Sequence, residues 1–487
     1  MQAEHRWRPL RWLPWLAVCA VCLYLATPSL TQSKRDDAPA KKAPAPPAAA
    51  SSSYDQVTPA LLGQVTFADM MAKDKAGKDA VMARQRKLLE KRYDLQAHPD
   101  KKVKMSRGKP IPVGPATRLP EGMTWEQLAA LSPKEIRDKN RFPQGFLPLP
   151  HPHHEVGGMV FPQMEIKQLA RLQRFDLDFD LPEHFLPEFP PAIFLTTRLD
   201  LGDVSQGKVV TVDNFQEIFQ GILNAKDLEG VRLLVTQFPQ QQFNATADRK
   251  TDQAIGKQGV TCFDCHVNGH TSAATHLVGD IRPQSHRRRL DTPSLRGVHI
   301  QRLFGSQRAL KTIEDFTEFE QRAAYFDGDQ VSAVAKGINP LERGGQVHFM
   351  SEFQELLAFP PAPGLGIDGK LNPKKFNADS EEMKGQKLFF GKAQCGSCHP
   401  APYYTDNSMH DLQVERFYKE QKHNGLIAST QGPIKTFPLR GIKESPPYFH
   451  DGRLLTLEDT VEFFNLILET KLSSEEKKQL VAFMRQL

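Results

Sequence analysis

Cysteine is scarce in this sequence of 487 residues, and its few positions are informative. Of the six cysteines, Cys19 and Cys22 lie near the N-terminus, and the other four form two pairs far along the chain. The stretch from Tyr54 to Lys250 contains none. Any cysteine chemistry in the body of the protein therefore depends on the two pairs alone.

Strong net charge is also missing. The formal net charge of +6 is spread over a long chain, and the densest basic run, Arg287-Arg288-Arg289, is short. Segments that bind nucleic acid usually carry longer blocks of lysine and arginine. We therefore expect no nucleic-acid partner.

The first thirty residues lack an apolar run of full membrane-spanning length. They carry Arg6, Arg8 and Arg11, followed by apolar residues from Trp12 to Ala26. This pattern is typical of a signal peptide or an uncleaved signal anchor, and a run of about fifteen residues favours the cleaved form. We expect residues 1–32 to direct export to the periplasm, with an inner-membrane anchor as the alternative.

Two segments of different character follow the leader. Residues 33–53 are mostly Ala, Pro, Lys and Ser, so they have little to bury and are expected to form a disordered linker. Residues 54–250 are expected to form an additional N-terminal domain, irregular and partly helical. Helix starts are indicated at Thr124 and Ser132, because each is followed three residues later by Gln or Glu.

The two cysteine pairs each belong to a Cys-x-x-Cys-His run. Two thiols one helical turn apart can add to the vinyl groups of one haem, and the following histidine then lies beneath the iron as its proximal ligand. A zinc site or a redox-active dithiol is the alternative. The adjoining histidines and the export signal favour two covalently bound haem c groups. The first run contains Cys262, Cys265 and His266, and the second contains Cys395, Cys398 and His399.

An internal repeat surrounds these runs. Leu295-Arg296-Gly297-Val298 matches Leu439-Arg440-Gly441-Ile442, and Thr312-Ile313-Glu314-Asp315 matches Thr456-Leu457-Glu458-Asp459. Both matches have the same separation of 144 residues, from 295 to 439 and from 312 to 456. A shared register of this kind indicates two homologous domains.

The fold is therefore expected to be mostly α-helical. Two tandem cytochrome c-like haem domains would occupy residues 251–370 and 371–487, preceded by the N-terminal domain. Each haem domain would be small, with the haem serving as much of its core.

Three motifs carry a resemblance to a known family. They are Tyr403-Tyr404-Thr405-Asp406-Asn407-Ser408-Met409-His410, Phe437-Pro438-Leu439-Arg440 and Pro447-Tyr448-Phe449-His450-Asp451-Gly452-Arg453. Together they closely resemble the bacterial di-haem cytochrome c peroxidases, whose superfamily includes the MauG-like enzymes. The likeness covers about residues 251–487.

The resemblance implies an oxidoreductase that reduces hydrogen peroxide to water. The first haem, on His266, would be peroxidatic, and the second, on His399, would relay electrons from a small cytochrome c, a cupredoxin or a quinol. Two alternatives stay open: an oxidase or oxygenase of the same superfamily that modifies a protein or organic substrate, and an electron carrier without catalysis. Assembly as a homodimer is also left open.

The chain departs from the family at the relay haem. A Met or Tyr from the helix after the Thr-Leu-Glu motif ligates this iron in the family, whereas Phe463 and Phe464 stand on that helix here. Neither can bind iron. Met409 is then a possible sixth ligand, and His410 and Met484 are further candidates.

The family also has a catalytic glutamate beyond the repeat helix of the first domain. Glu320 is our first choice, because it occupies the repeat position of Phe464. Glu318 and Asp327 are the alternatives. A carboxylate at this place would move the proton that peroxide reduction requires.

Three further features follow from the resemblance. His276 is a possible distal ligand of the first haem, and a calcium ion would map to Asp291 with the carbonyls of Thr436 and Pro438. The tryptophan that lies between the haems in the family is absent, and Phe304 stands in its region. Electron exchange would then use Phe304, Tyr325 or proximity alone, unless Trp125 folds back from the N-terminal domain.

Overall fold

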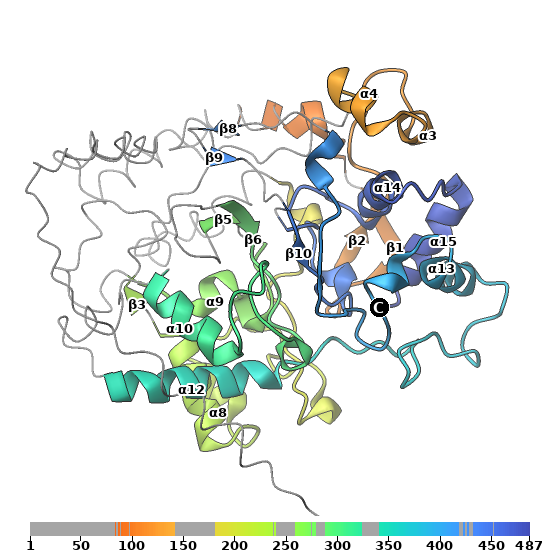
Figure 1. Cartoon of the computed structure of the whole chain (residues 1–487). Coiled ribbons are helices and arrows are strands. Elements are labelled where there is room, and N and C mark those ends of the chain that lie inside the picture. Colours follow the sequence, from red (N-terminus) through yellow and green to blue (C-terminus); the bar gives the residue numbers. More distant parts are fainter. Residues whose placement is uncertain are drawn as a thin grey trace, which may run out of the picture. The chain divides into compact units, whose positions relative to one another are not determined.

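The computed structural model describes residues 83, 86–87, 89–96, 98–141, 181–236, 238–239, 259–273, 275–278, 288–323, 340–417, 422–423, 426–427, 432–450 and 452–487. This part is mostly helical with few strands, which confirms the expected helical class (Figure 1). Across these ranges, no helix is long and apolar enough to cross a membrane. The expected leader and linker lie outside the described residues.

The α-helices are α3 (Trp125–Ala129), α4 (Pro133–Asp138), α7 (Phe215–Phe219), α8 (Ala225–Leu234), α9 (Cys262–Cys265), α10 (Ile313–Ala323), α12 (Pro340–Leu356), α13 (Glu381–Phe390), α14 (Leu457–Ile467) and α15 (Ser474–Met484). Short 3-10 helices are η3 (Glu183–Phe185), η4 (Leu199–Leu201), η6 (Val267–Gly269), η7 (Val298–Ile300), η8 (Cys395–Ser397), η9 (Val414–Phe417) and η10 (Ile442–Glu444).

The strands form only antiparallel two-stranded pairs within the described residues. The pairs are β1 (Pro99–Lys104) with β2 (Pro110–Pro112), β3 (Phe238–Pro239) with β4 (Gly259–Val260), β5 (Thr275–Val278) with β6 (Arg288–Asp291), β7 (Met409–His410) with β10 (Ile434–Lys435), and β8 (Lys422–His423) with β9 (Leu426–Ile427).

Capping boxes begin two helices where the sequence predicts them. The Thr124 hydroxyl accepts a hydrogen bond from the Gln127 amide at 3.2 Å, and the Ser132 hydroxyl accepts one from the Glu135 amide at 3.3 Å. In both cases the third-position side chain bonds back to the cap amide, so two otherwise unsatisfied donors are paired. The start of α15 has the same box, formed by Ser473 and the residue three positions on.

One apolar core surrounds the first Cys-x-x-Cys-His run. Helix α8 lies against α12 (Figure 1), and Gly230 allows this close approach, because a Cβ there would stand 2.1 Å from the Phe349 carbonyl oxygen. Phe353 of α12 is fully buried and its ring packs against Phe263 of the run. The first run is therefore held by a packed helix pair.

A second core surrounds the other run. Helices α13 and α15 lie side by side (Figure 1), and a Cβ at Gly385 would stand 1.9 Å from the Gln479 carbonyl oxygen. The rings of Phe389 and Phe483, both fully buried, meet edge to face at 5.3 Å between centroids. A glycine thus allows the two helices of each pair to approach closely where they cross.

Some described segments of residues 54–250 pack on these two cores, and others, such as Leu89 and Phe185, belong to a third apolar cluster. Trp125, only 8% exposed, belongs to the same core cluster as Phe463 of α14. The Glu126 carboxylate accepts a hydrogen bond from Lys477 of α15 at 2.8 Å. The segment around α3 therefore covers the second core.

Residues 181–236 pack instead on the first core. The Asn268 amide nitrogen donates to the Pro191 carbonyl at 2.8 Å and to the Lys208 carbonyl at 2.9 Å. The Asn268 carbonyl oxygen accepts from the Val210 amide at 2.9 Å. One side chain beside the first run thus fixes two stretches of this segment. The expected domain boundaries stay predictions.

A buried carboxylate joins the loop before α3 to helix α14. Asp459 is fully buried and accepts a hydrogen bond from the Thr117 amide at 2.9 Å. Burial raises the pKa of Asp459 from its ordinary 3.8 to about 6, because desolvation disfavours the charged form. The hydrogen bond from Thr117 opposes this effect only in part.

Asp459→Asn should therefore stabilise the protein at neutral pH. Below about pH 4 the carboxyl is protonated in both states, and between about pH 4 and 6 the unfolded state releases its proton first, so the wild-type free energy of unfolding falls. The variant should gain up to about 3 kcal/mol relative to wild type between pH 4 and pH 7. Urea unfolding at both pH values measures this gain, and a pH-independent difference would contradict it.

Candidate active site

A cavity of about 620 Å³ is lined by both Cys-x-x-Cys-His runs. Its wall is mostly apolar and includes Phe304, Phe359 and Phe464. A cavity of this size and lining is typical of a site for an organic cofactor. The six residues of the runs that line it are Cys262, Cys265, His266, Cys395, Cys398 and His399.

The histidine of the first run, His266, is held in one tautomer. The His266 Nδ1 lies 2.9 Å from the Pro293 carbonyl oxygen, which can only accept, so Nδ1 must donate and Nε2 keeps its lone pair. Desolvation by the surrounding protein lowers the pKa of His266 to about 4, which keeps the ring neutral. A neutral imidazole oriented by a backbone carbonyl is the usual form of a metal-ligating histidine.

The second run has the same arrangement with a different partner. The His399 Nδ1 donates to the Tyr404 carbonyl oxygen at 2.7 Å. Burial lowers the pKa of His399, although the Tyr404 carbonyl and Asp406 oppose this shift. The second imidazole therefore also offers Nε2 as a ligand.

The cysteines do not support a shared zinc site. Nowhere in the described part of the chain do three or more His, Cys, Asp or Glu side chains gather to hold a metal ion. Burial raises the pKa of Cys395 to about 12, so its thiol stays protonated at neutral pH. Two separate pairs, each followed by an oriented imidazole, fit the thioether attachment of haem better than zinc.

The two candidate glutamates on α10 differ in position. Glu320 is half-buried and lines the cavity. Glu318 is half-buried but does not line it. Asp327 lies outside the described residues. Of the two candidate acids that the structure describes, only Glu320 lies in the cavity wall, which also contains both runs.

The candidate sixth ligands of the second iron also differ in whether they line the cavity. Met484 and His410 line the cavity, whereas Met409 does not. The His410 Nε2 is hydrogen-bonded to the Asp406 carboxylate at 2.7 Å, so only its Nδ1 is left to bind iron. Phe464 lines the cavity as well.

The remaining predicted residues are the candidate calcium ligands, the possible distal ligand His276 and the candidates for electron exchange. Asp291, Thr436 and Pro438 all line the cavity, and the Thr436 carbonyl already accepts a hydrogen bond from the Thr405 hydroxyl at 2.6 Å. His276 lies in β5, and its side chain is outside the described part. Of the candidates for electron exchange, Phe304 lines the cavity, Trp125 does not, and Tyr325 lies outside the described residues.

A buried ion pair beside the cavity was not expected from the sequence. Arg296 donates to the Glu444 carboxylate at 2.8 Å, with both side chains about 95% buried. His270, also buried, contacts the Glu444 carbonyl oxygen through Nε2 at 2.9 Å and the Ser294 hydroxyl through Nδ1 at 2.7 Å. Ser106 of the N-terminal region donates to the same carboxylate. This network links both halves of the repeat. No local sequence pattern predicts it, because its members are far apart in the chain.

The backbone partners of the two proximal histidines were missed for the same reason. Pro293 lies 27 residues beyond His266. The bond is to its backbone carbonyl, which any residue type could supply. Tyr404 follows His399 by five residues, without a recognisable motif for this bond. Only the fold shows which carbonyl each ring meets.

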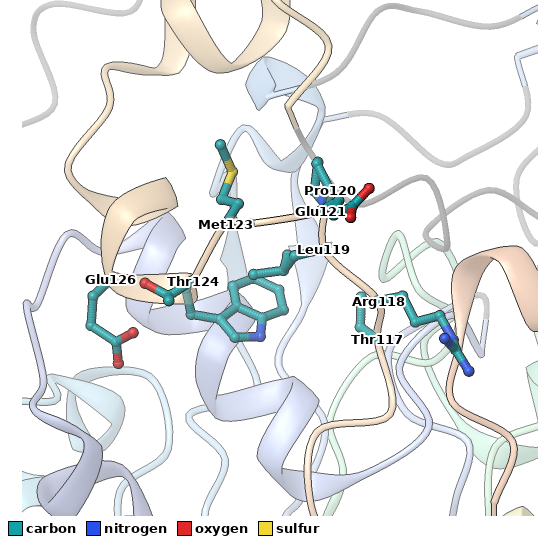
Figure 2. A pocket seen from close by; sticks show the side chains of 10 residues that line it. Thr117, Arg118, Leu119, Pro120, Glu121, Met123, Thr124 and Glu126 are labelled. Carbon is teal, nitrogen blue, oxygen red and sulfur yellow. The ribbon is translucent and has the colours of Figure 1, made fainter.

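A second hollow, of about 600 Å³, lies elsewhere (Figure 2). It is lined by the continuous stretch 117–126, which has no cysteine or histidine. Figure 2 shows Leu119, Met123 and Glu126 around it, and Leu119 and Met123 pack against the second core. This hollow is separate from the residues that carry the chemistry.

Comparison with known proteins shows what the chain is similar to. No protein-family model matches it. Cytochrome c551 peroxidase of Nitrosomonas europaea is 30% identical over 145 residues, which is 28% of this chain and 42% of that protein. The methylamine utilization protein MauG of Methylorubrum extorquens is 30% identical over 156 residues, 28% of this chain and 42% of that protein. These matches confirm the resemblance to the di-haem cytochrome c peroxidase and MauG superfamily.

The likeness is partial. The chain spans less than half the length of these curated relatives. A solved MauG-like protein associated with microbial copper homeostasis is 18% identical, with a TM-score of 0.36 over 57% of this chain and 91% of that one. A TM-score of this size is too low to show a shared fold.

Proposed function

We propose that this protein is an exported di-haem c-type peroxidase that reduces hydrogen peroxide to water. One observation carries the proposal: a single cavity is lined by both Cys-x-x-Cys-His runs, and both imidazoles present Nε2 as a ligand. The named relatives, a cytochrome c peroxidase and MauG, support the same class of activity. Two tandem haem domains would surround this cavity.

Each run would have its own task. Bound haem would supply redox chemistry at iron, and His266 and His399 would each hold the iron of one haem. Glu320, in the cavity wall, would accept and return the proton that cleavage of peroxide requires. The site of His399 would pass electrons from a small cytochrome c, a cupredoxin or a quinol in the periplasm or its membrane.

A calcium ion between the two halves is part of this proposal. Asp291 would supply a carboxylate, and Thr436 and Pro438 would supply carbonyl oxygens. Hard oxygen ligands of this kind suit calcium in an exported protein. Its role would be to hold the walls of the cavity together.

Steady-state oxidation of a reduced small cytochrome c tests the function. The matured protein should oxidise this donor only when peroxide is present, at a rate that saturates with peroxide. If absorption and electron paramagnetic resonance spectra show both irons six-coordinate with strong protein ligands in every redox state, peroxide has no place to bind. That result would leave only the electron-carrier interpretation.

A second function is favoured by Phe464. A phenylalanine in the cavity wall, on the helix that carries the relay ligand in the family, leaves the second iron without a ligand from α14. An iron site of this kind suits an enzyme that oxidises a protein or organic substrate. Peroxide-dependent product formation from such a substrate, without a donor cytochrome, distinguishes this function from the first.

Phe464→Met should supply the missing ligand. Methionine sulfur is a known axial ligand of c-type haem, so the second iron is expected to become six-coordinate and low-spin. Absorption and electron paramagnetic resonance spectra of the ferric protein report this change. Phe463→Met is the matched control, because Phe463 is fully buried and does not line the cavity. Identical spectra for both variants would show that Phe464 does not face the iron.

A further inference from the structure

Lys435 places a buried amine in the wall of the cavity. It belongs to β10, where it pairs with Met409, and it is only 3% exposed. Its Nζ lies 5.3 Å from the ring centroid of Phe304 and 5.3 Å from that of Phe437. Both rings line the same cavity. The ammonium is therefore held between two aromatic side chains, away from bulk water.

Among the residues that the structure describes, this ammonium has no counter-ion. Its Nζ donates to the Gln301 side-chain oxygen at 2.9 Å, and in the described ranges it forms no ion pair with a carboxylate. Burial lowers the pKa of Lys435, and the positive charge of Arg308 acts in the same direction. The Nε of Arg308 is itself buried without a hydrogen-bond partner among the described residues.

Such an arrangement is costly unless an anion completes it. A buried cation needs a charged or strongly polar partner, and a second cation nearby increases the cost. One amide oxygen and two ring faces satisfy the lysine only in part. An anion in the cavity can supply this partner, because Lys435 lines the cavity wall together with Phe304, Phe437 and Gln301.

We propose that Lys435 binds a propionate carboxylate of a haem seated in this cavity, with Gln301 fixing the ammonium and Phe304 and Phe437 flanking it. The inference rests on the proposed function, because it takes the cavity to hold porphyrin. Propionates are the anionic groups of haem, and a lysine at one of them forms a charge-assisted hydrogen bond.

A fixed positive charge at a propionate has a consequence for redox chemistry. It stabilises the reduced iron, which carries one positive charge less, so the reduction potential of that haem is raised. Removal of the charge should therefore lower the potential. An effect on a potential separates this role from packing between two rings, which a neutral side chain of similar length preserves.

The test compares three variants of the matured protein in spectroelectrochemical titrations. Lys435→Met should lower the ratio of reduced to oxidised haem at a fixed potential by about tenfold for one haem, or about 59 mV. Lys435→Arg keeps the charge and should stay near wild type. Lys443→Met is the control, since Lys443 donates to the Arg485 carbonyl at 3.3 Å and does not line the cavity.

Equal potentials in wild type, Lys435→Met and Lys443→Met would overturn the inference. If Lys435→Met does not mature, infrared spectra of protein with ¹³C-labelled propionates decide the matter: Lys435→Arg should shift a propionate stretching band, and an unshifted band overturns the proposal. These outcomes differ from failure of the proposed function, which would show as wild-type protein without haem or without peroxide turnover.

Discussion

Replacing Cys262 and Cys265 together by alanine is expected to remove one of two haems and to abolish peroxide turnover. Both thioether bonds of the first haem would depend on these thiols, and the other two cysteines of the cavity wall belong to the second run. The haem content by pyridine haemochrome absorbance should fall by about half. Oxidation of a reduced donor by peroxide should fall to background, a loss of at least about 10²-fold.

The matched control is the same replacement at Cys395 and Cys398. This variant should also lose half of its haem but should still show a spectral response to peroxide at the first site. Its donor oxidation should be slow, because the relay site is missing. If the two variants exchange these behaviours, peroxide is reduced at the haem on His399 and the assigned roles are reversed.

Glu320→Gln is expected to lower the turnover number about 10²- to 10⁴-fold, the usual contribution of a positioned acid or base. Glutamine keeps the size of the side chain in the cavity wall but cannot exchange the proton at neutral pH. The haem content and the spectra should stay those of wild type. Turnover with saturating peroxide and donor measures the effect.

Glu318→Gln is the control for this prediction. Glu318 lies on the same helix and is similarly half-buried, but it is not part of the cavity wall. Its replacement should change the turnover number less than about twofold. Equal losses in both variants would indicate a general effect on α10, and no loss in Glu320→Gln would place the proton transfer elsewhere.

Local features of the fold could be predicted from the sequence because their causes are local. The caps at Thr124 and Ser132 involve residues three positions apart, and the structure confirms both. The start of α15 at Ser473 has a capping box of the same local kind. The Cys-x-x-Cys-His runs are also short, so haem attachment can be predicted from them without knowledge of the fold.

Contacts between distant segments could not be predicted in this way. The partner of His266 is a backbone carbonyl 27 residues away, and a carbonyl has no signature in the sequence. The pair of Arg296 and Glu444 joins residues 148 positions apart. Lys435 resembles any other lysine until the fold places it between Phe304 and Phe437.

The role of residues 54–250 is a similar case. Composition and proline content predict an irregular, partly helical domain, but they do not say what it packs against. The structure places Trp125 in the second core and Asn268 in contact with Pro191 and Lys208, so the described parts of this region complete both cores. Such a role depends on surface complementarity, which emerges only when the segments are folded together.

His270 has a structural role that its position in the sequence does not reveal. A histidine soon after the first run is a candidate ligand by spacing, yet both of its ring nitrogens already contact protein oxygens. Its burial lowers the pKa and keeps the ring neutral. The position of His270 thus indicates a bridge between the two halves of the repeat.

The most direct test of the account is the intact mass of protein matured in a host that attaches haem c. The account predicts the mass of the polypeptide plus two haem groups, which survive denaturation because thioether bonds hold them. The polypeptide mass alone, from the same host and with a control cytochrome c correctly matured, would contradict it.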